Sequence, residues 1–137
     1  MITIHPNPLP IWDEIPENTV QKAIYKTLSA DWIREFPVGN GLIDLYSQDH
    51  IVEVKRATSS NPAYSTVGQV AYYRQALRLR GQDPIASILL YGSSLGKYTD
   101  HALTSLRLSL GVRLFLIVSL RDTAILDLDS GDLVSLE

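Results

Sequence analysis

Two apolar stretches, residues 41–46 and 51–55, contain charged side chains where a core would be expected. Asp44 interrupts one apolar run, and the triplet Glu53-Val54-Lys55 interrupts the next. A carboxylate among apolar side chains is costly unless it is paired or bound to a cation, and a second carboxylate on a neighbouring strand adds repulsion that a divalent ion would relieve. We therefore interpret Asp44 and Glu53 as ligands of Mg²⁺ or Mn²⁺, since Mg²⁺ commonly takes only one or two protein carboxylates. Lys55 would hold or deprotonate the attacking water.

These side chains are predicted to lie on a β-hairpin. Apolar and β-branched residues flank a turn-forming run at 48–50, which is the pattern of two strands joined by a short connection. Side chains alternate across a strand, so Glu53 and Lys55 share one face. Val52 and Val54 point to the other face, where a helix would cover them.

The pattern of the whole chain predicts one α/β domain over residues 16–137, preceded by an extended arm at 1–15. The domain is expected to hold a mixed sheet flanked by helices, with the element order αβββαβαβββ. Its predicted helices cover 16–30, 62–80 and 98–110, and its predicted strands cover 34–38, 41–47, 51–57, 85–91, 112–120, 123–128 and 133–136. Gly81 is a good C-cap for the second helix.

Composition limits the possible functions. The chain has 137 residues, 45% of them hydrophobic, which suffices for one domain with a substantial core. The absence of cysteine excludes disulfides, thiolate zinc sites and iron-sulfur clusters. No apolar run approaches the length of a membrane span and no leader pattern opens the chain, so we expect a soluble, cytoplasmic protein without a membrane partner. The net charge of -3 gives no whole-molecule attraction to nucleic acid.

Three motifs along the chain resemble the PD-(D/E)XK, or restriction-endonuclease-like, nuclease superfamily. They are Gly41-x-Ile43-Asp44, Glu53-x-Lys55 and Gln69-x-x-x-Tyr73, in the order that the family shows. The match as a whole covers roughly the first two thirds of the chain, and it looks most like the RecB-type and archaeal mismatch-endonuclease branches, with Holliday-junction resolvases close behind. One departure is that Ile43 replaces the proline before the aspartate, as in many members of these branches. The resemblance implies a restriction-endonuclease-like core, αβββαβ, with a further helix and a β-hairpin added at the C-terminal end.

The resemblance also implies a set of metal ligands. Asp44 and Glu53 would bind the metal together with the main-chain carbonyl of Val54. The family often adds an acid from its first helix, and Glu17 is our choice because it opens that helix. Glu14 remains open as the alternative.

Other positions inherit roles in catalysis and in contacts with nucleic acid. Lys55 would activate or orient the nucleophilic water, while Gln69 and Tyr73, four residues apart on one helix face, would steady the site and contact the nucleic-acid backbone. Positive side chains near the site and along the second helix are expected to contact phosphates: Arg56, Arg74 and Arg78.

The expected function is a Mg²⁺-dependent endonuclease that hydrolyses phosphodiester bonds of nucleic acid, with DNA as the expected substrate and a homodimer as the expected assembly. The alternative is a non-catalytic nucleic-acid-binding or regulatory subunit on the same fold. A purely structural reading makes Glu53 and Lys55 an ion pair at a sheet edge. Two further motifs, Gly92 to Gly96 and Asp127 to Gly131, resemble a nucleophile elbow and a calcium loop but are better interpreted as turns.

Overall fold

The computed structural model describes residues 12–58 and 63–137. Helices and strands alternate along the chain as expected for an α/β protein. The helices are α2 (Glu17–Tyr25), α3 (Ala63–Arg78), α4 (Gly96–Thr99) and α5 (His101–Ser109). The strands are β1 (Ile33–Val38), β2 (Gly41–Tyr46), β3 (His50–Arg56), β4 (Ile85–Tyr91), β5 (Val112–Ser119), β6 (Ala124–Asp127) and β7 (Leu133–Val134).

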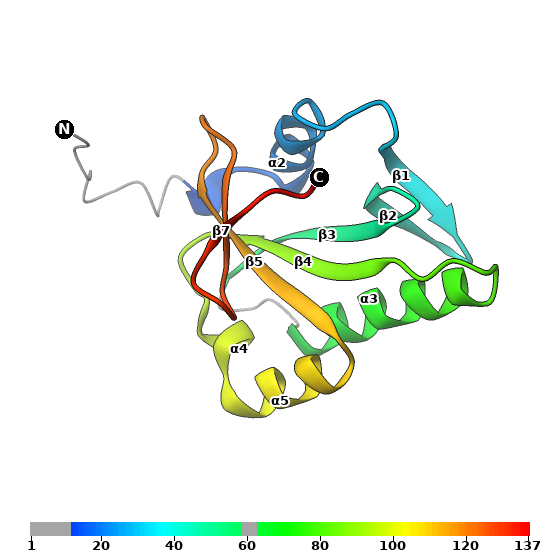
Figure 1. Ribbon diagram of the computed structural model, residues 1–137. Coiled ribbons are helices and arrows are strands. Elements are labelled where there is room, and N and C mark those ends of the chain that lie inside the picture. Colours follow the sequence, from blue (N-terminus) through cyan, green and yellow to red (C-terminus); the bar gives the residue numbers. More distant parts are fainter. Residues whose placement is uncertain (1–11, 59–62) are drawn as a thin grey trace.

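The seven strands form one mixed sheet whose spatial order follows the chain, from β1 to β7. Strands β3, β4 and β5 are parallel, whereas β1, β2, β6 and β7 are added to them in antiparallel fashion. The two parallel connections pass through α3 and through α4 with α5, which lie on one side of the sheet, while α2 lies on the other (Figure 1). The predicted mixed sheet flanked by helices is confirmed.

Each face of the sheet carries its own hydrophobic core. The face under α3 and α5 buries Ile51, Ile88 and Leu90, while the face under α2 buries Val52 and Val54. This alternation along β3 is the one that the sequence predicts, and it places Glu53 and Lys55 on the α3 face. Helix α2 packs its own Val20 and Ile24 against Val52 and Val54.

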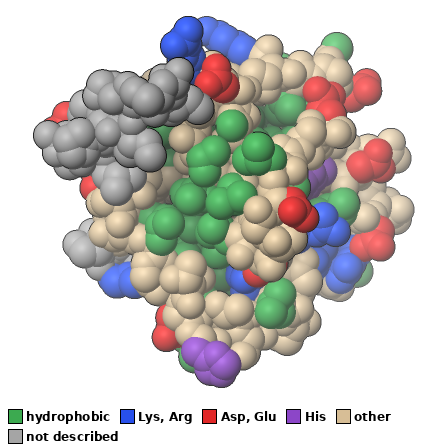
Figure 2. Space-filling model, turned by 60° about the vertical axis from the view of Figure 1, so that its left-hand side comes forward, with side chains coloured by type: hydrophobic (Ala, Val, Ile, Leu, Met, Phe, Trp, Pro, Cys, Tyr) green, Lys and Arg blue, Asp and Glu red, His purple; other side chains and the backbone are tan. Residues whose placement is uncertain are grey.

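Beyond α5, the sheet face on the α3 side stays partly open. Leu116, Leu126 and Leu133 are neighbours across β5, β6 and β7, and Leu133 is 70% exposed. Hydrophobic side chains gather near the middle of this side of the molecule (Figure 2).

Several predicted boundaries were wrong. The first helix ends at Tyr25 rather than near residue 30, and the third predicted helix is divided into α4 and α5, because Asp100 caps α5 by accepting a hydrogen bond from the N–H of Leu103. Residues 12–14 are helical rather than extended. The remainder of the predicted arm, residues 1–11, lies outside the described residues.

Two buried arginines connect the end of α5 to the rest of the domain. Arg107 is 2% exposed and pairs with Asp129 through both terminal nitrogens, at 2.6 and 2.8 Å. Arg74, on α3, donates to the carbonyls of Leu110 and Gly111, directly after the last turn of α5. A cation at a helix C-terminus interacts favourably with the unpaired carbonyls there.

We expect Arg74→Ala to lower the free energy of unfolding by about 1–3 kcal/mol, because two carbonyl groups lose a charged donor. Urea denaturation followed by circular dichroism would measure this loss. Arg80→Ala is the matched control, since Arg80 is an exposed arginine just beyond the same helix. An equal effect of the two substitutions would show that the contact with α5 contributes no stability.

Candidate functional site

The candidate site lies where β2 and β3 separate. The two strands pair in register only at Leu45 with Val52 and at Tyr46 with Ile51. On its other side, β3 remains paired with β4 over its whole length, from His50 to Arg56. The second half of β3 therefore needs other hydrogen-bond partners on its β2 side.

Two carboxylates supply these partners. The N–H of Val54 donates to Asp44 Oδ2 at 2.8 Å, and the N–H of Asp44 donates to Glu53 Oε1 at 3.0 Å. Each acidic side chain thus accepts a backbone hydrogen bond from the opposite strand. The arrangement brings the two predicted ligands together, as the sequence motif requires.

The backbone is strained opposite Asp44. Glu35 of β1 and Asp44 of β2 lie opposite each other, but they are skipped in the pairing of these two strands. Glu35 has a φ of +58°, which residues other than glycine rarely adopt. The regular alternation of β2 breaks here, because Ile43 and Tyr46 both face the α3 core while Leu45 faces the α2 core. Asp44 therefore sits at a distortion that frees it from regular pairing with either neighbouring strand.

The positive charge near Asp44 and Glu53 is too small to stabilise both of them as carboxylates. Glu53 is 4% exposed, and burial followed by the charge of Asp44 raises its pKa to about 9. Burial also raises the pKa of Asp44, against the lowering effects of the Val54 N–H and of Lys55. A pKa of about 9 favours the protonated form of Glu53 at neutral pH, so the pair is expected to keep one proton when no cation is bound.

Lys55 is half-buried on the same face as Glu53, and its charge acts on both carboxyl groups. The alternative of a sheet-edge ion pair is wrong, because β3 lies between β2 and β4. Among the described residues, the ion pairs are Arg78 with Asp83 and Arg107 with Asp129. Lys55 therefore lies beside the acidic pair but forms no salt bridge with it.

Gln69 and Tyr73 meet as the motif predicts. Gln69 Nε2 donates to the Tyr73 hydroxyl at 3.0 Å, and the N–H of Leu42 bonds to the same oxygen. A Cβ at Gly41 would lie 2.2 Å from that hydroxyl, so only glycine fits there. Burial raises the pKa of Tyr73, and the charges of Glu53 and Asp44 raise it further, which shows that the tyrosine lies within electrostatic range of the acids.

Glu17 reaches the same end of β3 without joining the pair. Its Oε2 accepts the N–H of Arg56 at 2.8 Å, and its charge raises the pKa of Asp44. Within the described part of the chain, no three acidic or histidine side chains converge as a metal-binding group. Glu14 is exposed and lies in the helical turn before α2.

Asp13 is a residue that the sequence analysis missed. Its carbonyl accepts from Arg56 Nη1 at 2.9 Å, while its carboxylate accepts the N–H and the hydroxyl of Ser93. It thereby ties the end of β3 to the loop after β4. Gly92 of that loop has a φ of +108° and leaves no space for a Cβ between Asp13 and Ala57, so the loop has the turn role that we expected.

The three arginines predicted to contact phosphates occupy different environments. The guanidinium of Arg56 is half-buried at the end of β3. Arg78 is exposed and paired with Asp83 at 2.8 Å. Arg74 is buried against α5, and in this position its guanidinium cannot reach a phosphate. Of the three, only Arg56 lies on β3, next to Lys55 in the chain.

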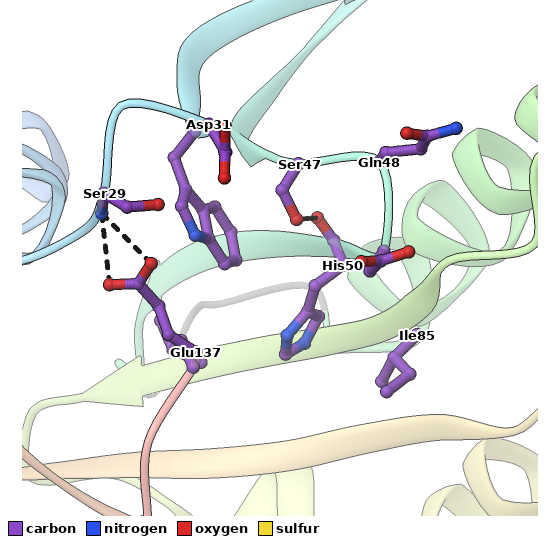
Figure 3. Close-up of a pocket in the computed structure, with 10 residues that line it drawn as sticks. Ser29, Asp31, Ser47, Gln48, His50, Ile85 and Glu137 are labelled. Atoms are coloured by element: carbon purple, nitrogen blue, oxygen red, sulfur yellow. Dashed lines mark hydrogen bonds between the residues drawn. The ribbon is translucent and has the colours of Figure 1, made fainter.

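A cavity of about 510 Å³ lies at the opposite end of β3, beside His50 (Figure 3). The ring of His50 is satisfied by Ser87 Oγ at 2.9 Å and by the backbone at Leu136, and burial lowers its pKa to about 4. Glu137, at the same cavity, accepts the N–H of Ser29. Packing and hydrogen bonding account for this neutral histidine, and we assign the cavity no chemistry.

Comparisons of the chain with protein-family models, with curated proteins and with solved structures found no match. The functional argument therefore depends on the residues and on their geometry.

The proton held by the acidic pair predicts how stability depends on pH. From about pH 7.5, folded and unfolded His50 are both neutral, since the ordinary pKa of histidine is 6.5, whereas Glu53 keeps its proton only in the folded protein, up to a pKa of about 9. The folded state therefore binds more protons, and stability falls as pH rises, by at most ~1.4 kcal/mol, or about 5 °C in Tm, per pH unit. Calorimetry of metal-free protein between about pH 7.5 and 8.5 would measure this slope.

Glu53→Gln should remove most of the slope and raise Tm at pH 8, because the amide oxygen still accepts the Asp44 N–H without a charge. Asp49→Asn, in the exposed turn between the same two strands, is the control and should leave the slope unchanged. A wild-type slope equal to that of Glu53→Gln would mean that the pair holds no proton.

Proposed function

We propose that this protein is a Mg²⁺- or Mn²⁺-dependent nuclease that hydrolyses phosphodiester bonds, with DNA as the expected substrate. The observation that carries the proposal is the acidic pair itself: Asp44 and buried Glu53 each accept a backbone N–H from the opposite strand, and Lys55 lies beside them. Neutral amide side chains could accept the same backbone hydrogen bonds without repulsion, whereas two carboxylates suit a divalent cation that would compensate the charge of both. The finer fold assignment, a restriction-endonuclease-like core, belongs to the same proposal.

The donor atoms present suit a hard cation. Asp44 and Glu53 offer carboxylate oxygens, and the Val54 carbonyl is expected to point to the same side of β3 as its N–H, which contacts Asp44. Such oxygen ligands are preferred by Mg²⁺, which keeps its remaining positions for water and substrate phosphate. A bound ion would lower the pKa of its water and stabilise negative charge on the phosphate.

The chain's own residues then have distinct tasks. Lys55 donates a hydrogen bond that orients the water that attacks phosphorus, and the proton of that water passes to solvent. The phosphorus forms a bond to the water oxygen as the bond to the leaving oxygen breaks, and that oxygen takes a proton from solvent. Gln69 and Tyr73 position the nucleic-acid backbone over the pair, since their contacts fix them against β2.

The alternative is a nucleic-acid-binding or regulatory subunit. A binding module has no use for a cation site, and the freedom of Lys55 from any salt bridge among the described residues favours the enzyme. Cleavage of both strands of a duplex would need two sites, so a homodimer stays a prediction. Among the described residues, no helix is long and apolar enough to cross a membrane.

Metal dependence is the first test of the proposal. Labelled DNA should be cleaved with Mg²⁺ or Mn²⁺ and not in chelator. Asp44→Asn and Glu53→Gln should each lower the rate by at least about 100-fold while the protein stays folded, because each removes an ion ligand. Asp49→Asn is the matched control. Undiminished cleavage in chelator would contradict the mechanism.

The Lys55→Ala substitution distinguishes the role of the lysine from that of the metal ligands. We expect a rate loss of about 100-fold or more with Mn²⁺ affinity kept within about threefold, since an ammonium group assists the water rather than the ion. Titration calorimetry and single-turnover cleavage would measure the two quantities on the same protein. Lys97→Ala, an exposed lysine in α4, serves as the control. Loss of Mn²⁺ binding together with activity would mean that Lys55 organises the metal site itself.

A further inference from the structure

The outer side of α3 carries an aromatic ridge that folding does not explain. Tyr64, Gly68 and Tyr72 follow one another at intervals of four residues, so they form one row along the helix. Each tyrosine is 54% exposed. None of the three belongs to the buried residues of α3, such as Val67, Val70 and Leu77, which pack against the sheet.

Gly68 is the unexpected member of the ridge. Glycine is disfavoured in the middle of a helix relative to alanine. No atom lies within 4 Å of where its Cβ would be, so neither packing nor a close approach of another element requires glycine there. The residue leaves an open space on the helix surface between two tyrosine rings.

The ridge is continuous with the acidic site. The Tyr72 ring lies 5.8 Å from that of Tyr73, whose hydroxyl bonds to Gln69 and whose pKa is raised in part by the charges of Glu53 and Asp44. The Tyr72 hydroxyl approaches Gly39 in the turn between β1 and β2, which holds the ring in place.

The charges of the protein are poorly suited to a duplex. Duplex binding depends largely on cations that neutralise phosphates. The net charge is -3, and several guanidinium groups are engaged by the protein itself. These are Arg34 with Asn18 and Gln21, Arg74 with Leu110 and Gly111, Arg78 with Asp83, and Arg107 with Asp129.

We propose, on the basis of the proposed nuclease function, that the substrate is an unpaired nucleic-acid strand whose bases stack on Tyr64 and Tyr72 and lie over Gly68. Stacking on aromatic side chains contributes to single-strand binding without needing many cations, because every base has a flat face. Isolated exposed tyrosines are ordinary on protein surfaces. The helical spacing, the open glycine and the contact with Tyr73 distinguish this pair. One site suffices for one strand, so a monomer could act.

The test is binding of fluorescent oligonucleotides of about 12 residues to the full chain in Ca²⁺, followed by anisotropy. Single-stranded DNA, single-stranded RNA and duplex DNA of one sequence are compared. Tyr64→Ala and Tyr72→Ala should each weaken single-strand binding about tenfold, while the phenylalanine variants stay within about twofold, because stacking needs the ring. Leu79→Ala is the control, since Leu79 is 81% exposed just past the end of the same helix.

Gly68→Leu excludes loss of folding as the cause. Leucine is a better helix former, so this variant should melt no lower than wild type while its single-strand binding falls about tenfold. Tight binding of either single strand, DNA or RNA, with these losses supports the inference. Equal binding of duplex and single strand, unchanged by the tyrosine and glycine variants, would overturn it and leave the nuclease proposal standing. Mn²⁺ binding at Asp44 and Glu53 without binding of any oligonucleotide would overturn both.

Discussion

The backbone hydrogen bonds that the side chains of Asp44 and Glu53 accept across β2 and β3 are the constraint on which the site depends. Where β2 and β3 separate, these two carboxylates replace the missing backbone partners, through Val54 N–H to Asp44 and Asp44 N–H to Glu53. This arrangement places two acidic groups close to each other, with Glu53 buried and Asp44 half-buried. Without a cation, that position is tolerable only if the pair keeps a proton, which is why the pKa of Glu53 rises to about 9.

The surrounding fold holds this arrangement rigidly. Strand β3 is fixed on one side by its continuous parallel pairing with β4 and on both faces by helices α2 and α3. Tyr73 presses against Gly41 and fixes β2 relative to α3, while Asp13 ties the end of β3 to the loop after β4. Because neither strand can shift easily, the acids cannot move apart to relieve their repulsion. In the proposed function, a divalent cation takes the place of the proton that the pair keeps.

The sequence predicts what depends on regular periodicity. The faces of β3, the covering of Val52 and Val54 by a helix, and the meeting of Gln69 with Tyr73 all follow from periods of two and of four residues. What it could not predict depends on the tertiary context. Nothing about Glu35 favours its positive φ. The burial of Arg74 requires knowledge of where α5 ends, and Asp13 acts on a loop far along the chain. The start of α5 at Asp100 could have been predicted, because aspartate is a favoured N-cap residue.

The most direct test of the account is an anomalous difference map from crystals grown or soaked with Mn²⁺ near pH 8. The account predicts a single strong peak bonded to carboxylate oxygens of Asp44 and Glu53, at about 2.0–2.2 Å, with the Val54 carbonyl as a further ligand. The same peak should be absent from Glu53→Gln crystals of equal quality. A map without a peak at the pair would contradict the claim that this protein uses the two carboxyl groups to hold a cation.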